Sequence, residues 1–344
     1  MDYPFFYRNK MQIPFGDRNN EVVYGFYANR THYIIPNKNC VVGFRGYAEI
    51  LNSIKEFVEM SKIPIYDENK KTGILREVLL RSSNYNDSCS REVSITLIIN
   101  DKNYKENLRV YRKFVDYILE RNYNGQEIKT ICLNINTNDT NVILGLENYI
   151  LYGDGFIEDN ILDIKYKIFV NNFYQINMEM TKKLYSGIID YAKLVDFKNV
   201  LDLYCGIGTI TLQFSKFAKK VLGIEVVKES IETANINKKI NNIKNVDFLC
   251  RNTEKLNIDD LNCAKENFDL ICVDPPRKGL NKSVIEKIVK INPKRIIYVS
   301  CDSATLARDI NFFVNENYRL ECFKLYDMFP HTMHIETVAL LSKK

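Results

Sequence analysis

The stretch Asn199-Val-Leu-Asp-Leu-Tyr-Cys-Gly-Ile-Gly-Thr209 decides the fold, because it joins a strand, a glycine turn and the start of a helix. Its first residues have the apolar, β-branched character of a buried strand. Gly206 and Gly208 permit a tight turn and a close backbone approach, and the helix that follows offers unpaired N–H groups at its N-terminus. We therefore expect a ligand to bind at this turn.

Two neighbouring features indicate which kind of ligand that is. Glu225 ends the next predicted strand about 20 residues later, where such folds bind ribose hydroxyls. The third glycine of the dinucleotide fingerprint is missing, because Thr211 occupies its place. Together with Asp202 before the turn, this pattern predicts an adenosine-bearing cofactor and favours S-adenosylmethionine over NAD.

Residues 166–344 alternate predicted strands with helical segments, which indicates a doubly wound parallel sheet. Two further strands close the chain after the last predicted helix, so we expect about seven strands with a hairpin-like C-terminal pair. This is the layout of a Rossmann-like class I methyltransferase. The predicted strands are Asn199 to Tyr204, Val221 to Glu225, Val246 to Leu249, Phe268 to Val273, Arg295 to Ser300, Leu320 to Leu325 and Glu336 to Leu341.

Residues 1–165 mix strands and helices and predict a separate α+β domain. Val22 to Tyr27 and Glu92 to Ile99 are rich in β-branched and aromatic residues, whereas Tyr47 to Phe57 has helical spacing. We expect this domain to bind RNA. A chain of 344 residues with 46% hydrophobic content can build a core in each of two domains.

Composition excludes several classes of protein. No run of about 18 apolar residues occurs, and the N-terminus lacks a signal-peptide layout, so we expect a cytoplasmic monomer with no membrane partner. Nine scattered cysteines without a Cys-x-x-Cys pair, and three histidines, make a zinc or iron–sulfur site an unfavoured interpretation, and we expect no metal. A net charge of +5 is compatible with an RNA partner but does not require one.

Two predicted strands end in residues suited to catalysis. Asp274-Pro-Pro-Arg277 follows one strand, and Cys301 lies between another strand and a predicted helix. A free cysteine has a pKa of ~8.5, which N–H groups at a helix start can lower. We therefore expect Cys301 to be a nucleophile, while an inert buried thiol is the alternative that position alone leaves open.

These segments resemble the RNA uracil-5 methyltransferase family, whose members methylate C5 of uridine in tRNA or 23S rRNA. Four ordered stretches carry the resemblance: Asn171-Asn-Phe-Tyr-Gln-Ile-Asn177, Asp274-Pro-Pro-Arg-Lys-Gly279, Ser300-Cys-Asp-Ser-Ala-Thr-Leu-Ala-Arg-Asp309 and Asp327-Met-Phe-Pro-His-Thr-Met-His-Ile-Glu-Thr337. The resemblance is to a short form, because the β-barrel and four-cysteine iron–sulfur segment of many members have no counterpart in this sequence. The sequence is similar either to a minimal member or to a fragment, and we expect no iron–sulfur cluster. Thr209 stands where several members have asparagine.

The resemblance implies a role for each matching residue. Cys301 is expected to be the nucleophile and Glu336 the base, and both belong to the catalytic set. His331 and His334 are expected to shape their loop. The expected cofactor contacts are Gln175, Tyr204, Gly206, Glu225, Asn252 and Asp274. The expected contacts with the target base are Asp274, Arg277 and Phe173, with Tyr174 or Phe329 as alternative stacking partners.

The sequence thus predicts an S-adenosylmethionine-dependent enzyme that forms 5-methyluridine in RNA, with 23S rRNA favoured over tRNA. Two interpretations of other kinds remain. Cytosine C5 methylation also uses a cysteine, but the loop at Asp274 has no Pro-Cys pair. A catalytically idle RNA-binding or assembly protein could keep the fold, but it would not need both Cys301 and Glu336.

Overall fold

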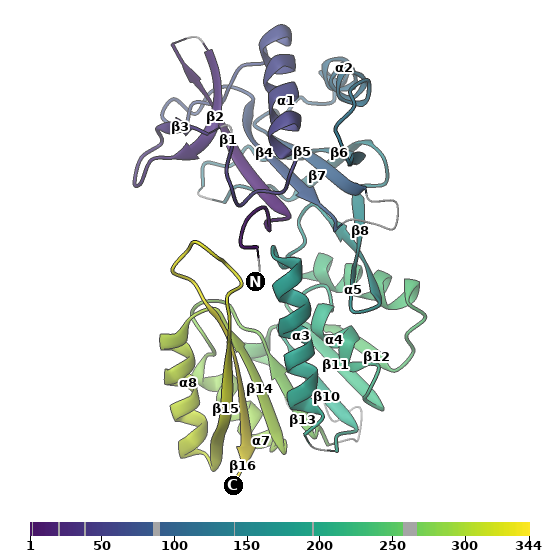
Figure 1. Ribbon diagram of the computed structural model, residues 1–344, viewed down its shortest axis with the longest axis vertical. Helices are drawn as coiled ribbons and strands as arrows, with labels where there is room; N and C mark the ends of the chain where they lie inside the picture. Colours follow the sequence, from purple (N-terminus) through teal and green to yellow (C-terminus); the bar gives the residue numbers. More distant parts are fainter. Residues whose placement is uncertain are drawn as a thin grey trace. The chain divides into compact units, whose positions relative to one another are not determined.

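The computed structural model describes residues 1, 3–19, 21–37, 39–84, 90–140, 142–194, 196–256 and 267–344. The chain forms two compact units (Figure 1). The N-terminal unit comprises Pro4–Asp159 and Ile168–Asn171, and the C-terminal unit comprises Met1–Tyr3, Asn160–Lys167 and Asn172–Lys344. The predicted boundary after residue 165 falls inside strand β9 (Ile164–Phe169), one arm of the hairpin that begins with β8 (Phe156–Ile161).

The N-terminal unit has a seven-stranded sheet with helices, which confirms the predicted α+β class. The strand order is β3-β2-β1-β4-β5-β6-β7. Among the strands that the structure describes in this unit, β5 and β6 alone pair in parallel, because helix α2 connects them, and a parallel pair needs such a crossover. The elements are β1 (Lys10–Arg18), β2 (Glu21–Tyr27), β3 (Ile34–Pro36), α1 (Tyr47–Ser61), β4 (Leu75–Ser82), β5 (Arg91–Ile99), α2 (Leu108–Leu119), β6 (Gln126–Ile135) and β7 (Glu147–Tyr152).

The core of the N-terminal unit lies between its sheet and its two helices. Helices α1 and α2 are amphipathic, and the rings of Phe57 and Phe114 meet at 5.2 Å between centroids. Val78, Ile95 and Leu133 contribute fully buried side chains from three strands of the sheet. Burial of these apolar faces is what holds two marginal helices in place.

The C-terminal unit contains a second seven-stranded sheet, in the order β12-β11-β10-β13-β14-β16-β15. Five strands are parallel, and β16 pairs antiparallel with β14 and β15, as the expected hairpin-like pair does. The elements are α3 (Met178–Ala192), β10 (Asn199–Leu203), α4 (Thr209–Phe214), β11 (Lys220–Glu225), α5 (Lys228–Ile240), β12 (Val246–Cys250), η1 (Thr253–Lys255), β13 (Leu270–Val273), α7 (Lys282–Ile291), β14 (Arg295–Ser300), α8 (Ser303–Asn315), β15 (Tyr318–Tyr326) and β16 (Glu336–Lys343).

The strand order creates a crevice at one edge of this sheet. From β10 the chain proceeds outward through β11 and β12, and then returns to place β13 on the other side of β10. Ligands bind at the carboxyl ends of strands where the order reverses in this way. All four residues of β13 are buried, as expected for a strand covered on both faces. The loops after β10, β13 and β14 therefore open toward one crevice.

No helix in the described part of the chain combines the length and the apolar character needed to span a membrane.

Candidate active site

The turn after β10 uses its two glycines for different purposes. Gly206 has a φ of 54°, and a Cβ built there would have no atom within 4 Å, so the backbone lies open at this point. Gly208 has a φ of 82° and precedes α4, and a Cβ there would approach the Phe248 ring to 2.7 Å. Gly208 is therefore required by packing, whereas Gly206 leaves space for a ligand.

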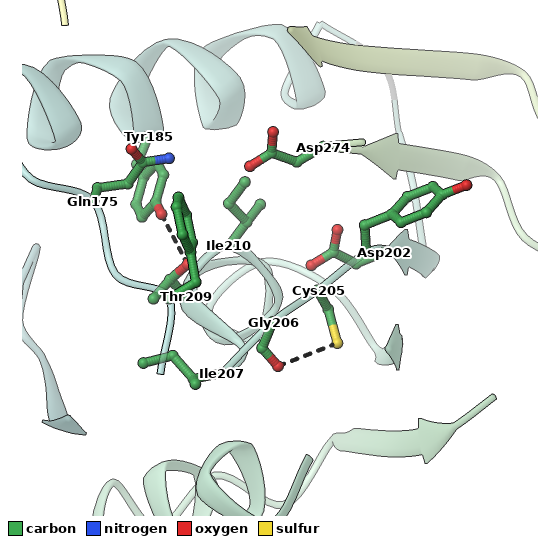
Figure 2. A pocket seen from close by; sticks show the side chains of 11 residues that line it. Gln175, Tyr185, Asp202, Cys205, Gly206, Ile207, Thr209, Ile210 and Asp274 are labelled. Carbon is green, nitrogen blue, oxygen red and sulfur yellow. Dashed lines mark hydrogen bonds between the residues drawn. The ribbon is translucent and has the colours of Figure 1, made fainter. Parts of the chain in front are cut away.

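A pocket of about 340 Å³, part of it open to solvent, adjoins this turn (Figure 2). Four of the predicted cofactor residues and the predicted stacking residue Phe173 line it. The lining residues are Phe173, Gln175, Tyr185, Asp202, Tyr204, Cys205, Gly206, Ile207, Thr209, Ile210 and Asp274. Tyr204 has a φ of 65°, a strained conformation for a tyrosine that is common at functional sites.

Two other predicted cofactor residues lie outside this lining and support it. The Glu225 carboxylate accepts N–H groups of Gly206 at 3.2 Å, Val226 at 2.7 Å and Val227 at 3.0 Å. It thereby joins the glycine turn to the end of β11. The Asn252 side chain accepts a backbone N–H at the start of η1, at 2.8 Å, and so caps that turn.

Asp202 faces the pocket from the end of β10, a contact that was not predicted from the sequence. Its side chain is 1% exposed, one oxygen accepts the Thr211 hydroxyl at 2.5 Å, and the other has no hydrogen-bond partner among the described residues. Burial, joined by the charges of Asp274 and Glu225, raises the pKa of Asp202 to about 7. The Thr211 hydroxyl therefore holds this acid from the position of the missing third glycine.

A tyrosine missed by sequence reasoning comes from α3 and bonds to Thr209 at the start of α4. The Tyr185 hydroxyl donates to Thr209 Oγ1 at 2.8 Å, as the dashed line in Figure 2 shows, and the Tyr166 hydroxyl donates to the Thr209 carbonyl at 3.0 Å. Gln213 donates to the Tyr166 oxygen at 3.2 Å. A tyrosine at helical spacing gives no signal that separates this role from ordinary packing, so no pattern in one sequence could have identified it.

The two predicted catalytic residues lie beside each other because of strand register. Ser300 at the end of β14 pairs with Thr337 of β16, so the next position in the same antiparallel register brings Cys301 opposite Glu336. Asp274 follows β13, the other neighbour of β14. The charges of Glu336 and Asp274 both act on the Cys301 thiol, and that of Asp274 acts on Glu336. The structure thus brings a thiol and two carboxyl groups together.

The acidity of this cluster differs from the sequence prediction at one point. Burial and the Asp274 charge raise the pKa of Glu336 to about 8, and burial raises that of Asp274 to about 7. Burial and the two carboxylates also raise the pKa of Cys301, although Arg277 opposes them. The predicted lowering of the Cys301 pKa by the helix start is therefore wrong, because burial and the two carboxylates outweigh the groups that lower it. Asp302 caps α8, and Cys301 precedes this cap by one residue.

Arg277 and the loop between β15 and β16 border the cluster. The Arg277 guanidinium lies 3.2 Å from His334 Nε2, and the Phe329 ring meets the His334 ring edge-on at 6.4 Å. Asn177 caps α3 and donates to the Met328 carbonyl at 3.0 Å. His334 thus contacts two other residues at this border, and Asn177 anchors the start of the loop just after β15.

The aromatic residues proposed for base stacking differ in exposure. Phe173 is 68% exposed and lines the pocket, so its ring is available to a ligand. Tyr174 is 2% exposed and its hydroxyl lies 3.8 Å from the Met178 sulfur, so it packs inside the unit and presents no face to a base. Phe329 is partly exposed beside His334. Within the described residues no group of three or more His, Cys, Asp and Glu could hold a metal ion.

The sheet order and the pocket at its reversal point define a Rossmann-like class I methyltransferase. Comparison with known proteins narrows this class. The model of the tRNA (uracil-5-)-methyltransferase family matches residues 75–344, and the chain belongs to this family. Membership of this family makes the protein an RNA methyltransferase, whose substrate is an RNA.

Relatives extend the similarity over the whole chain. An uncharacterized RNA methyltransferase of Staphylococcus aureus (strain N315) is 39% identical over 100% of this chain and 73% of its own length. One from Clostridium tetani is 37% identical over 99% of this chain and 72% of its own length. The crystal structure of Pyrococcus abyssi tRNA (uracil-54, C5)-methyltransferase in complex with S-adenosyl-L-homocysteine has a TM-score of 0.78 and 27% identity, over 98% of this chain and 76% of that one.

Proposed function

We propose that this protein transfers a methyl group from S-adenosylmethionine to C5 of a uridine in RNA, forming 5-methyluridine. The observation that carries the proposal is the convergence of Cys301, Glu336 and Asp274 beside the pocket at the glycine turn. We further propose that the reaction takes place in the cytosol and that the RNA is 23S rRNA.

The pocket residues fit the cofactor. Gly206 leaves its Cβ direction open, and Asp202 has a buried carboxylate oxygen without a partner among the described residues. Gln175 and Tyr204 add polar groups to the lining, while Glu225 carries the carboxylate that such folds use for ribose. When bound, S-adenosylmethionine supplies an electrophilic methyl group.

The first step assigned to the chain is nucleophilic addition. The Cys301 thiolate forms a bond to C6 of the uracil, and the C5–C6 π electrons move toward the O4 carbonyl, which makes C5 nucleophilic. Arg277, whose charge acts on Cys301, is placed to offset negative charge on the adduct. The thiol proton must first leave to solvent, so that Glu336 stays available as the base of the second step.

The second step assigned to the chain restores the ring after C5 has gained the methyl group. The Glu336 carboxylate removes the C5 proton, the C5–H electrons re-form the C5–C6 double bond, and the C6–S bond breaks to release the Cys301 thiolate. A base with a pKa of about 8 suits this task near neutral pH, because it binds the proton strongly enough to remove it. The protein returns to its initial state when Glu336 gives this proton to solvent and the Cys301 thiolate takes one up, so that one proton is released for each methyl group transferred.

Methylation of RNA from cells that lack the gene tests the proposal. Incubation with labelled cofactor should place one label on C5 of a uridine in 23S rRNA. Mapping of 5-methyluridine should find this uridine unmethylated in the RNA before incubation. Label on tRNA would support the second candidate, which the Pyrococcus abyssi relative favours because its own target is uracil 54 of tRNA. Label on cytosine, or none on any RNA, would refute the proposed reaction.

The cofactor part of the proposal predicts different effects for the two glycines. Gly206→Ala should weaken S-adenosylmethionine binding at least about tenfold, because the methyl group enters the pocket, while the positive φ costs only about 1 kcal/mol of stability. Gly208→Ala is the matched control and should lower the melting temperature more, because its methyl group meets Phe248. Calorimetric titration and thermal unfolding measure both. Unchanged cofactor affinity in Gly206→Ala would contradict the assignment of the pocket.

We also propose that the N-terminal unit binds the RNA backbone, with the exposed face of α2 as one contact. Arg109, Arg112 and Lys113 are exposed on this face, and none of them has an ion-pair partner in the described part of the chain. Like charges at these spacings disfavour a helix by a few tenths of a kcal/mol. Phosphate groups would relieve that repulsion.

Charge reversal tests this contact. The triple variant Arg109→Glu, Arg112→Glu, Lys113→Glu should bind transcribed 23S rRNA at least about tenfold more weakly. The slope of log K against the logarithm of the salt concentration should become less steep by about 2 to 3. The matched control reverses Lys198, Lys219 and Lys244, which are exposed and precede β10, β11 and β12 at the sheet edge opposite the pocket. Equal losses in both variants would mean that only net charge matters.

A further inference from the structure

The pocket and the catalytic cluster share one acid. The Asp274 charge acts on Asp202 and Tyr185, which line the pocket, and also on Cys301 and Glu336. Asp274 itself lines the pocket. The methyl group must pass from the pocket to the base held by Cys301, so Asp274 lies where that transfer takes place.

Asp202 and Asp274 face the same space from neighbouring strands, β10 and β13 (Figure 2). Asp202 is 1% exposed, and its Oδ1 atom has no partner among the described residues. Two carboxylates that face one pocket cannot both hold their charges cheaply away from water. Such a pair needs either a proton or a cation.

The other groups around the pair do not supply that cation. The charges that act on Asp202 are those of Asp274 and Glu225, both negative, and Thr211 contributes only a hydroxyl. The groups on which Asp274 acts are the Tyr185 hydroxyl, the Cys272 and Cys301 thiols and the Glu336 carboxyl. The neighbouring Arg277 acts on Cys301 and on Asp302, which caps α8.

The proposed cofactor and its product differ by one positive charge, and this charge would balance the two carboxylates. S-adenosylmethionine and S-adenosylhomocysteine carry the same amino acid and adenosine groups, but only the former has a positive sulfonium. We propose that Asp202 and Asp274 act as a charge-sensing pair that takes up the sulfonium cofactor with release of protons and binds the neutral product without release. This inference rests on the proposed function and assigns to its pocket a means of expelling the product.

The direction of the effect follows from acidity. Burial raises the pKa of both acids to about 7, so near neutral pH the empty pocket holds part of a proton on each. A bound cation favours the charged carboxylates and drives these protons into solvent. Affinity for the cation should therefore rise with pH through about 7, while affinity for the neutral product should not.

Calorimetric titration of the full chain in two buffers of different ionisation enthalpy measures the released protons directly. The probes are S-adenosylmethionine, S-adenosylhomocysteine and sinefungin, an analogue in which an amine-bearing carbon replaces the methylated sulfur. Near pH 7 the two cations should release up to about one proton each and bind up to about a hundredfold more tightly at pH 8 than at pH 6, whereas the neutral product should show neither effect. Asp202→Asn should reduce the release and lower the preference for the cofactor over the product about tenfold.

The outcomes separate this inference from the proposed function. Tight binding of S-adenosylmethionine with equal heats in both buffers, or equal proton release by the neutral product, would overturn the charge-sensing pair and leave the methyltransferase proposal intact. Failure of the chain to bind any of the three probes would overturn both. Asp274→Asn provides a second variant if Asp202→Asn does not fold, and the wild-type measurement depends on neither.

Discussion

Cys301→Ala is expected to abolish methyl transfer and every covalent complex with RNA. Without the sulfur atom nothing adds to C6, so C5 keeps the low nucleophilicity of an intact uracil ring, and the rate should fall by about 10⁴-fold or more. RNA that carries 5-fluorouridine at the target provides the measurement, because fluorine at C5 leaves no proton for Glu336 to remove. Wild-type protein should form a complex with this RNA that survives denaturing electrophoresis, and the variant should form none.

The control for this variant is another cysteine of the same unit. Cys322 on β15 is also partly exposed, and Cys322→Ala should retain both methylation and the trapped complex. Cofactor binding should be unchanged in Cys301→Ala, because Cys301 is not part of the pocket lining. A stable complex formed by Cys301→Ala would show that another nucleophile attacks the base.

The sequence predicted the parts of this site that depend on backbone topology. The strand at Asn199, the glycine turn and the final antiparallel pair follow from periodicity and turn chemistry, and the sheet order then places the loops of Asp274 and Cys301 at one crevice. The predicted class and family are confirmed.

The parts that sequence reasoning missed depend on side-chain burial and on neighbours distant in sequence. The raised pKa of Cys301 results from burial and from carboxylates that arrive on β16 and after β13, whereas the helix start is local and was the only influence visible in sequence. Asp202 was recognised as an acid before the turn, but its partnerless oxygen depends on which atoms surround it in the fold. Tyr185 is an ordinary helical tyrosine until its hydroxyl is seen to bond to Thr209.

Glu336→Gln is expected to stop the reaction after methyl transfer. Cys301 can still add to C6 and C5 can still gain its methyl group, but the amide cannot remove the C5 proton, so the C6–S bond cannot break. A covalent, methylated RNA–protein complex should therefore accumulate with ordinary uridine, which wild-type protein does not trap. Mass spectrometry of the nuclease-digested complex should find one methyl group on the adduct. Free 5-methyluridine produced at the wild-type rate would assign the base to another residue.

The same substitution should stabilise the protein, and the size of this effect should depend on pH. Glu336 is 4% exposed, and its pKa is raised from 4.5 to about 8, so the folded state holds a proton that the unfolded state has lost. The contribution of Glu336 to the free energy of unfolding is therefore complete below about pH 4.5. It is lost as pH rises through about 8, by a few kcal/mol at most. Glutamine removes that loss. The melting temperature of Glu336→Gln should exceed the wild-type value, and the gap should widen between about pH 6 and pH 9 at roughly 2–4 °C per kcal/mol.

A control on the surface separates this effect from a general change in net charge. Glu321 lies exposed on β15 and accepts hydrogen bonds from Arg319 and Ser342, so its pKa is lowered and Glu321→Gln should reduce stability or leave it unchanged over the same pH range. If the difference in melting temperature widens in Glu336→Gln alone and the adduct is trapped, then one buried carboxyl both lowers stability as pH rises and acts as the base. A gap of constant size would mean that Glu336 keeps its charge throughout this range, and its strength as a base would then have to come from the bound RNA.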